Sequence, residues 1–230
     1  MNVGGLLSPD PTVNPRFFNF SFAFLRYCDG SSHTSNATLP LTVGNRTIWM
    51  RGRPNLAADF AYLTQTLGMG GTVVYTGGSA GGTSVFLSLD WVRALLPPST
   101  LLLGAPDAGM FLDAPVYSNA SNFFFREEFI AANSFWNSTG SGSLNSRCLA
   151  AFAAEPWRCF FPQNYARYIE TPWHAMMAAY DLASLSMILG LPCLPPKCSA
   201  TELQALLGWR DTFLGVLRPA VASFPVRSAS

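Results

Sequence analysis

A serine set among closely spaced glycines is the most chemically suggestive feature of this sequence. Residues 77–81 read Gly-Gly-Ser-Ala-Gly and match the G-x-S-x-G pattern of a nucleophile elbow, with Ser79 as the nucleophile. Such a turn strains the serine backbone, and Gly77 and Gly81 leave room for neighbouring chain. A helix beginning there would let the Ala80 N–H donate to a developing oxyanion. The alternative is a glycine-rich loop that turns the chain or binds a phosphate.

The acid of a catalytic triad would come from an aspartate downstream of Ser79. Hydrolases with this elbow order their triad as Ser, then Asp or Glu, then His. Asp181 follows the apolar stretch 172–180 and is our preferred acid, whereas Asp107, after a nearer apolar run, is the second choice. For either aspartate the competing interpretation is a turn or helix-cap residue.

The base of such a triad is harder to find. The chain contains two histidines, His33 and His174, and neither follows Asp181. His174 lies within an apolar stretch and is expected to be a satisfied core residue. His33 lies in a Gly/Ser-rich segment and is expected in a loop that could face a substrate. Since loss of a triad base costs many orders of magnitude in rate, we expect the isolated chain to be nearly inactive.

The elements that must position Ser79 can be predicted from residue spacing. Residues 72–76 are β-branched and aromatic between glycines, which predicts a buried strand of a parallel sheet. Apolar residues at helical spacing over 85–96 predict a helix, and Pro97-Pro98 ends it. The elbow therefore has a strand before it and a helix after it, as the motif requires.

Hydrophobic patterns elsewhere predict alternating strands and helices. We expect strands at 17–28, 47–50, 101–103 and 172–180, and helices at 55–67 and 122–135. This alternation indicates an α/β class: a mostly parallel sheet flanked by helices. The irregular region 117–162, rich in Asn, Ser, Phe and Trp, would form a disulfide-closed insertion.

Composition narrows the classes of function. The 230 residues are 49% hydrophobic and 12% charged, with a formal net charge of +1, so we expect one domain over 1–230 and no nucleic-acid partner. No Walker loop, dinucleotide motif or metal-ligand spacing is found, so no cofactor and no metal are expected. The apolar stretch 175–191 is interrupted by Asp181 and Gly190 and predicts no membrane span. We expect a monomer.

Cysteines and glycosylation sequons point outside the cytosol. Short-loop disulfides are plausible between Cys148 and Cys159 and between Cys193 and Cys198, which leaves Cys28 over; the alternative is five reduced thiols. The N-terminus does not resemble a signal peptide. Five N-x-Ser/Thr sequons nevertheless favour a secreted protein; they are at Asn19, Asn36, Asn45, Asn119 and Asn137.

Several separated motifs, in order along the chain, resemble the pectin acetylesterase family, which includes the Notum-type protein deacylases. The similarity runs from about residue 14 to about residue 217. Its motifs are Arg-Tyr-Cys-Asp-Gly-Ser-Ser at 26–32, Gly-Ser-Ala-Gly-Gly at 78–82, Asp-Ala-Gly-Met-Phe-Leu-Asp at 107–113, Cys-Phe-Phe-Pro-Gln at 159–163 and Ala-Tyr-Asp at 179–181.

This resemblance implies an α/β-hydrolase-like fold that removes acetyl esters from pectin in the cell wall. It implies Ser79 as nucleophile, Asp181 as triad acid and Ala80 in the oxyanion hole. The family also has an upstream glycine-rich segment ending in Trp-Cys and a downstream histidine beside cysteine, and this sequence contains neither. We therefore expect a chain truncated at both ends, with the disulfide partner of Cys28 in the upstream segment.

Two further functions remain open beside the pectin acetylesterase hypothesis. An inactive homologue could bind acylated glycans or lipids without cleaving them, as the absent triad histidine suggests. A deacylase of fatty-acylated protein would need a deep apolar pocket near Ser79. The aromatic stretch 123–136 could line such a pocket, although aromatic residues there could equally belong to the core.

Overall fold

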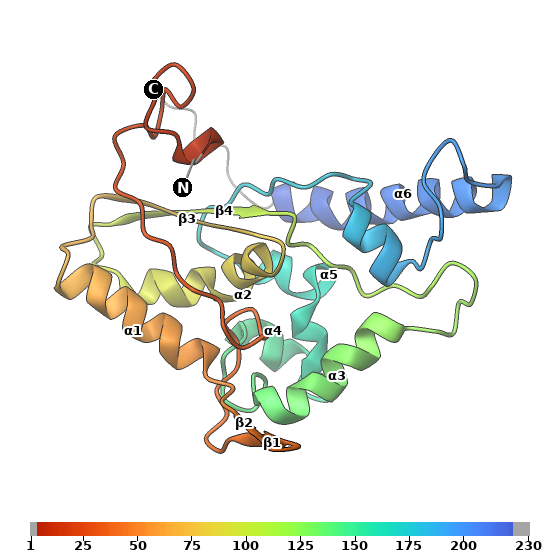
Figure 1. Cartoon of the computed structure of the whole chain (residues 1–230), viewed down its shortest axis with the longest axis horizontal. Helices are drawn as coiled ribbons and strands as arrows, with labels where there is room; N and C mark the ends of the chain where they lie inside the picture. Colours follow the sequence, from red (N-terminus) through yellow and green to blue (C-terminus); the bar gives the residue numbers. More distant parts are fainter. Residues whose placement is uncertain (1–3, 223–230) are drawn as a thin grey trace.

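The computed structural model describes residues 4–222, and its central feature is a pair of parallel strands (Figure 1). Strand β3 (Thr72–Gly78) pairs with β4 (Leu101–Asp107) along its whole length, from Thr72 opposite Leu101 to Gly78 opposite Asp107. Helix α2 (Ala80–Leu95) connects the two strands and packs against both. The chain therefore has the expected α/β class, and the predicted strand–turn–helix around Ser79 is confirmed.

A third extended segment lies beside β4, on the edge away from β3. The Gly104 N–H donates to the Pro172 carbonyl at 2.8 Å, and the Met176 N–H donates to the Pro106 carbonyl at 2.9 Å. Isolated parallel bridges join Trp173 to Gly104 and Met176 to Asp107. The strand predicted over 172–180 is thus too long, because β4 ends at Asp107 and leaves residues beyond Met176 without a ladder partner.

Helices pack against the strand pair and make up most of the regular structure outside it. Helix α1 (Gly52–Gln65) and α2 lie below the strands in the view of Figure 1. The predicted helices over 55–67 and 122–135 are confirmed as α1 and α3 (Phe124–Trp136). The other helices are α4 (Ser146–Ala151), α5 (Pro162–Tyr165) and α6 (Ala200–Ala222), with 3₁₀ turns η1 (Gly5–Leu7), η2 (Pro156–Phe160) and η3 (Ala166–Tyr168) and the π turn η4 (Ser184–Ile188).

The region before α1 departs most from the sequence-based expectation. The strand predicted over 17–28 is wrong, since these residues follow an irregular path and none of them belongs to a strand. A ladder needs a neighbouring backbone at hydrogen-bonding distance, and no strand in the described part of the chain pairs with this segment. The strand predicted over 47–50 is confirmed in part as β2 (Arg46–Ile48), which forms an antiparallel hairpin with β1 (Leu41–Val43).

One buried core runs under the strands and into the region of α3. Its centre includes Leu56 of α1 and Val85 and Leu89 of α2, which are fully buried. A disulfide joins Cys148 to Cys159, with both side chains fully buried, and a second joins Cys193 to Cys198. Both predicted pairings are confirmed. Cys28 is unpaired and exposed. Across the described residues, no helix has the length and apolar character needed to cross a membrane.

Candidate active site

Ser79 occupies a sharp turn between β3 and α2. Its backbone angles are φ 53° and ψ −119°, which place a non-glycine residue in a sparsely populated region. The side chain is exposed, and the residue precedes the first turn of α2. Strain of this kind persists only where the surrounding structure holds the chain in place. The backbone of Ser79 therefore has the conformation expected of a nucleophile elbow.

The glycines around Ser79 have different roles from one another. A Cβ atom on Gly77 would lie 2.6 Å from the backbone of Gly81, so position 77 requires glycine. A Cβ on Gly81 would meet open space, so a side chain is tolerated at position 81. It is the backbone of Gly81 that lies close to Gly77. The expectation that both glycines relieve the turn is thus met sterically at Gly77.

A second close backbone approach, between Gly82 and the end of β4, was not predicted from the G-x-S-x-G motif. A Cβ on Gly82 would lie 2.3 Å from the Asp107 carbonyl oxygen, and a Cβ on Gly109 would lie 2.3 Å from the Gly82 backbone. The Thr83 hydroxyl adds a hydrogen bond to the Gly109 carbonyl at 3.0 Å. The signal was present in the sequence, because both glycines lie inside the separated motifs that carry the family resemblance.

The backbone of Ala80 is placed to stabilise negative charge. Ala80 is the first residue of α2, so its N–H belongs to the group of helix N–H donors that have no intrahelical acceptor. No acidic side chain lies in the first turn of α2 to compete for these donors. The helix N-terminus also favours an anion electrostatically. This arrangement suits an oxyanion forming next to Ser79.

Asp107, the second-choice acid, contacts Ser79 through its backbone. The Ser79 N–H donates to the Asp107 carbonyl oxygen at 2.9 Å, while Asp107 itself is exposed at the end of β4. The Ala108 N–H in turn donates to the Met176 carbonyl at 2.7 Å. A chain of main-chain hydrogen bonds therefore joins the elbow, the end of β4 and the segment that leads to Asp181.

Asp181 follows that third segment and is half-buried. It lies in a turn rather than at a strand end, because its own N–H donates to the Ala178 carbonyl at 3.1 Å. The Oδ2 atom accepts the Ser184 N–H at 2.7 Å, as a helix cap does. Since carboxyl ends of parallel strands meet at one edge of a sheet, Asp181 and Ser79 both follow elements that end there. Within residues 4–222 no hydrogen bond reaches the Ser79 hydroxyl.

Neither histidine is hydrogen-bonded to Ser79 within residues 4–222. The loop expected for His33 is confirmed, but its exposure to substrate and the core placement of His174 are wrong. His33 is buried, not substrate-facing, and its Nδ1 lies 2.9 Å from the Ser84 hydroxyl of α2. Burial lowers the pKa of His33. His174 is exposed rather than in the core, since its neighbour Trp173 takes the inward direction and packs on Phe86 at 5.2 Å. Alternation along an extended segment turns His174 the other way.

The aromatic stretch 123–136 contributes to the core, and none of its residues lines the apolar groove described below. Phe125 is buried, and the Phe129 ring is tilted against the Phe125 ring at 5.0 Å and against the Phe160 ring at 5.3 Å between ring centres. An open apolar groove of about 570 Å³ instead follows Asp181 along the chain. It is lined by Leu182, Leu185, Ser186, Leu191, Leu194 and Lys197, among others. No cluster of metal-binding side chains occurs within the described residues.

Two of the separated motifs contact each other directly. Gln163 donates through Nε2 to the Asp113 carbonyl at 2.9 Å and accepts the Asp113 N–H at 3.3 Å. Arg126 of α3 makes a two-pronged contact with the Asp113 carboxylate, from Nε to Oδ1 at 2.9 Å and from Nη2 to Oδ2 at 2.9 Å. Its guanidinium also lies 3.7 Å from the centre of the Phe123 ring. The motifs therefore converge on one structural cluster that joins α3 to the disulfide-closed loop.

Comparison with known proteins gives consistent matches. The family model for pectinacetylesterase matches residues 1–226. Pectin acetylesterase 5 of Arabidopsis thaliana is 29% identical over 227 residues, covering 91% of this chain and 51% of the relative. Palmitoleoyl-protein carboxylesterase NOTUM of Drosophila melanogaster is 31% identical over 208 residues, covering 85% and 30%. The chain thus spans about half the length of the plant relative and less of NOTUM.

A solved structure matches the fold. The crystal structure of the Wnt deacylase Notum from Drosophila superposes with a TM-score of 0.79 at 24% sequence identity. The match covers 98% of this chain and 63% of the Notum chain. The expected α/β-hydrolase-like fold is confirmed by this likeness.

Proposed function

The chain belongs to the pectinacetylesterase family, and from that membership we propose that it is a serine carboxylic ester hydrolase that removes acetyl groups from cell-wall pectin. The observation that carries the proposal is the strained backbone of Ser79 between β3 and α2. The proposal extends to the secreted state, which two disulfides and five sequons support. We also propose that the chain acts as a monomer.

The proposed reaction is acyl transfer to Ser79. The Ser79 oxygen attacks the acetyl carbonyl carbon, and its proton passes to a base. The resulting oxyanion accepts hydrogen bonds from donors that include the Ala80 N–H. Collapse of the tetrahedral intermediate breaks the bond to the sugar oxygen, which leaves as a hydroxyl by taking the proton from the protonated base. Water then attacks the acetyl-serine ester and releases acetate. Asp181 has the role of orienting and stabilising the protonated base.

The base is the part of this mechanism that His33 and His174 do not supply. His33 is buried against Ser84, and no hydrogen bond links either histidine to Ser79 among residues 4–222. Free imidazole can replace a missing histidine where the nucleophile and the oxyanion donors are already in place. We therefore expect the 230-residue chain to release little acetate alone and more acetate when imidazole is added.

The experiment compares acetate release from acetylated pectin by the chain and by Ser79→Ala, each with and without imidazole. Wild-type release that rises with imidazole beyond the Ser79→Ala rate supports the proposal. Equal rates for the two proteins at every imidazole concentration would contradict it. Binding of acetylated pectin without Ser79-dependent release would favour an inactive homologue that holds acylated glycan.

A fatty-acyl deacylase is a second candidate, supported by the 31% identity over 208 residues to palmitoleoyl-protein carboxylesterase NOTUM of Drosophila melanogaster. A palmitoleoylated peptide offered beside acetylated pectin separates the two candidates. Ser79-dependent release of the long acyl group, with no release of acetate from pectin, would replace the pectin proposal with this one.

A further inference from the structure

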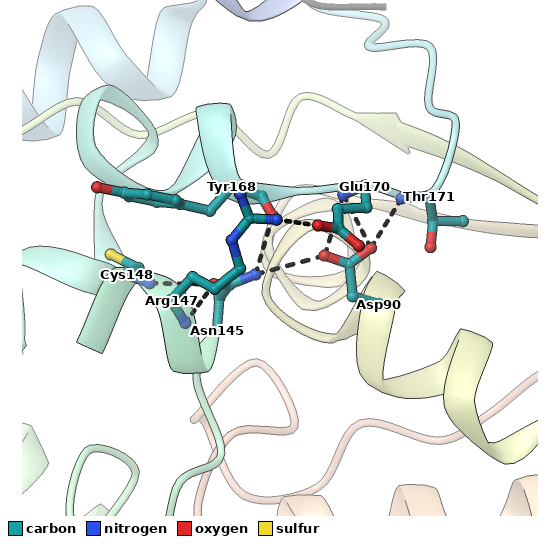
Figure 2. A network of polar contacts seen from close by, with 7 residues as sticks. All are labelled: Asp90, Asn145, Arg147, Cys148, Tyr168, Glu170 and Thr171. Carbon is teal, nitrogen blue, oxygen red and sulfur yellow. Dashed lines mark hydrogen bonds and ion pairs between the residues drawn. The ribbon is translucent and has the colours of Figure 1, made fainter. Parts of the chain in front are cut away.

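The carboxylate of Asp90 accepts hydrogen bonds from two consecutive backbone N–H groups. These groups lie just before the third extended segment, residues 172–176, which leads to Asp181 and is called here the acid-bearing segment. Asp90 lies on α2, and its Oδ1 accepts the Thr171 N–H at 2.8 Å and the Glu170 N–H at 3.1 Å. Its Oδ2 also lies 3.1 Å from the Glu170 nitrogen and 3.4 Å from Asn145 Nδ2. Figure 2 shows the carboxylate facing these donors. Hydrogen bonds to an ionised acceptor are among the stronger ones.

This carboxylate has no cation as a direct partner within the described residues. The nearby Arg147 pairs with the exposed Glu170 side chain, and Arg93 donates to the backbone carbonyls of Leu96 and Pro97. The negative charge of Asp90 is therefore balanced by main-chain and amide donors. Removing it would leave the N–H of the buried Thr171 without an acceptor, which costs free energy, whereas the exposed Glu170 N–H could turn to water.

The residues held by Asp90 are where the third extended segment begins. Directly after Thr171, the Pro172 carbonyl accepts the Gly104 N–H, and the His174 N–H donates to the Gly104 carbonyl at 2.8 Å. The segment then runs along β4 to Met176 and leads into the turn with Asp181. Asp90 thus fixes the point at which this segment enters the sheet.

Helix α2 follows Ser79 directly and also carries Asp90. The turn at Ser79 and the anchor of the segment that leads to Asp181 are therefore joined by one helix. Ser79 precedes the first turn of α2, and Asp90 lies in its later part. We propose that Asp90 is a positioning residue, which sets the register of residues 170–176 against α2 and thereby places Asp181 relative to Ser79. This inference rests on the proposed ester hydrolase function.

Register matters because a strand-like segment has a repeat of two. A slip by one residue would shift the end of the segment, from which the chain enters the turn with Asp181, by ~3.3 Å. It would also exchange the directions of Trp173 and His174, removing the Trp173 ring from Phe86 and turning a histidine inward. Misplacement of a catalytic group by about 1 Å can cost ~100-fold in rate.

The disulfide-closed loop is joined to the same anchor. Asn145 donates to Asp90 and to the Tyr168 carbonyl at 3.3 Å, while its Oδ1 caps α4 by accepting the Arg147 and Cys148 N–H groups. Figure 2 shows Asn145 between Asp90 and Cys148. Asp90 therefore meets the loop from one side and the acid-bearing segment from the other.

The test measures amide hydrogen exchange over 170–176 and imidazole-supported ester turnover in the full chain. Asp90→Ala removes the carboxylate, and Asp90→Asn keeps one acceptor oxygen and serves if the first variant fails to fold. Glu170→Gln is the matched control, since it removes the exposed Arg147–Glu170 pair and leaves the backbone donors in place. The substrate is an acetyl ester, and Ser79→Ala gives the background rate.

We expect Asp90→Ala to speed exchange at 170–176 and to lower kcat by ~10- to 100-fold with KM unchanged. Asp90→Asn should be intermediate and Glu170→Gln should resemble the wild type. Wild-type exchange in Asp90→Ala would overturn the proposal, and so would faster exchange with an unchanged kcat. A wild type without Ser79-dependent turnover would overturn the proposed function, and the exchange measurement alone would then decide whether Asp90 holds the segment.

Discussion

The Ser79 N–H donates to the Asp107 carbonyl oxygen at 2.9 Å, so the turn at Ser79 is bonded to the end of the neighbouring strand. This contact explains how a non-glycine residue keeps a positive φ of 53° at this point. It also gives Asp107 a function that needs no carboxylate. The end of β4 and the start of α2 are locked together through their main chains, and the glycines at 82 and 109 permit the close packing.

The glycines of the elbow should differ in their tolerance of a methyl group. Gly77→Ala would place a Cβ 2.6 Å from the Gly81 backbone, whereas Gly81→Ala would place one in open space. We expect Gly77→Ala to lower the free energy of unfolding by ~1–3 kcal/mol, the usual cost of overpacking. Gly81→Ala should change it by less than ~1 kcal/mol, the helix preference being in its favour. Urea unfolding of both variants measures this, and equal losses would contradict the steric account.

The two candidate acids should respond differently to truncation. Asp181 accepts the Ser184 N–H, while Asp107 acts through its backbone and its side chain is exposed. We expect Asp181→Ala to cost ~1 kcal/mol of unfolding free energy, as loss of a cap does, and Asp107→Ala to cost little. Thermal unfolding provides the comparison. A larger loss for Asp107→Ala would show that its carboxylate has a structural role that the hydrogen bonds do not include.

His33 should make stability depend on pH on the acid side of neutrality. Burial lowers the pKa of His33, and the positive charge of Arg53 adds to this, against the Arg26 carbonyl and the carboxylates of Asp29 and Asp59. The unfolded chain, with a histidine pKa of ~6.5, then binds the proton more readily than the folded chain. Stability is therefore complete above about pH 6.5 and is lost as the pH falls toward the lowered pKa.

The measurement is urea unfolding of the wild type and of His33→Gln between about pH 7 and pH 5. Glutamine keeps a polar group for Ser84 and does not titrate, so we expect His33→Gln to lose less stability on acidification. His174→Gln, at an exposed position, is the matched control and should retain the wild-type slope. Identical slopes for all three proteins would mean that His33 does not carry the effect.

The sequence predicted the elements that have strong local signals. The strand at Thr72, the helix after Ser79 and both disulfide pairs are where glycines, hydrophobic spacing and cysteine separation indicated. The strand is less buried than predicted, since Tyr75 is its one buried residue. The hairpin of β1 and β2 was missed in part, although Gly44-Asn45 between two β-branched stretches is a hairpin signal. Helix α6 was not predicted either.

Properties that depend on distant partners were beyond the sequence. The segment 17–28 has strand-forming residues, but a strand forms only where another backbone can pair with it. His33 has its hydrogen-bond partner at Ser84, on a distant helix. Asp90 likewise finds its backbone donors in a turn far along the chain, at Thr171. The direction of His174 depends on which neighbour faces α2, and Trp173 takes that place. None of these pairings leaves a local pattern in the sequence.

The two disulfides should differ in how readily they are reduced. Cys148 and Cys159 are fully buried, whereas Cys193 and Cys198 are half-buried. In native protein we expect a mild thiol reductant to open Cys193–Cys198 first, with Cys28 reacting at once with an alkylating reagent because it is exposed. Peptide mass spectrometry after timed alkylation gives the order. Earlier labelling of Cys148 and Cys159 would contradict it.

Removal of either disulfide should lower the free energy of unfolding, and removal of Cys148–Cys159 should lower it more. Replacing both cysteines of a pair by serine removes a constraint on the unfolded chain, which is worth ~3 kcal/mol for the longer loop and ~2 kcal/mol for the shorter one. Removal of Cys148–Cys159 adds the loss of packed sulfur in the core. Greater destabilisation by removing Cys193–Cys198 would oppose the burial argument.

The central claim is that Ser79 is an acyl-accepting nucleophile, and trapping the acyl-enzyme tests it most directly. The chain is mixed with an activated acetyl ester and imidazole, quenched in acid within seconds, digested and examined by mass spectrometry. We predict a transient acetyl group on the peptide that contains Ser79, absent in Ser79→Ala and unaffected in Glu170→Gln. A wild-type chain whose Ser79 peptide stays unmodified at every time and imidazole concentration would contradict the account.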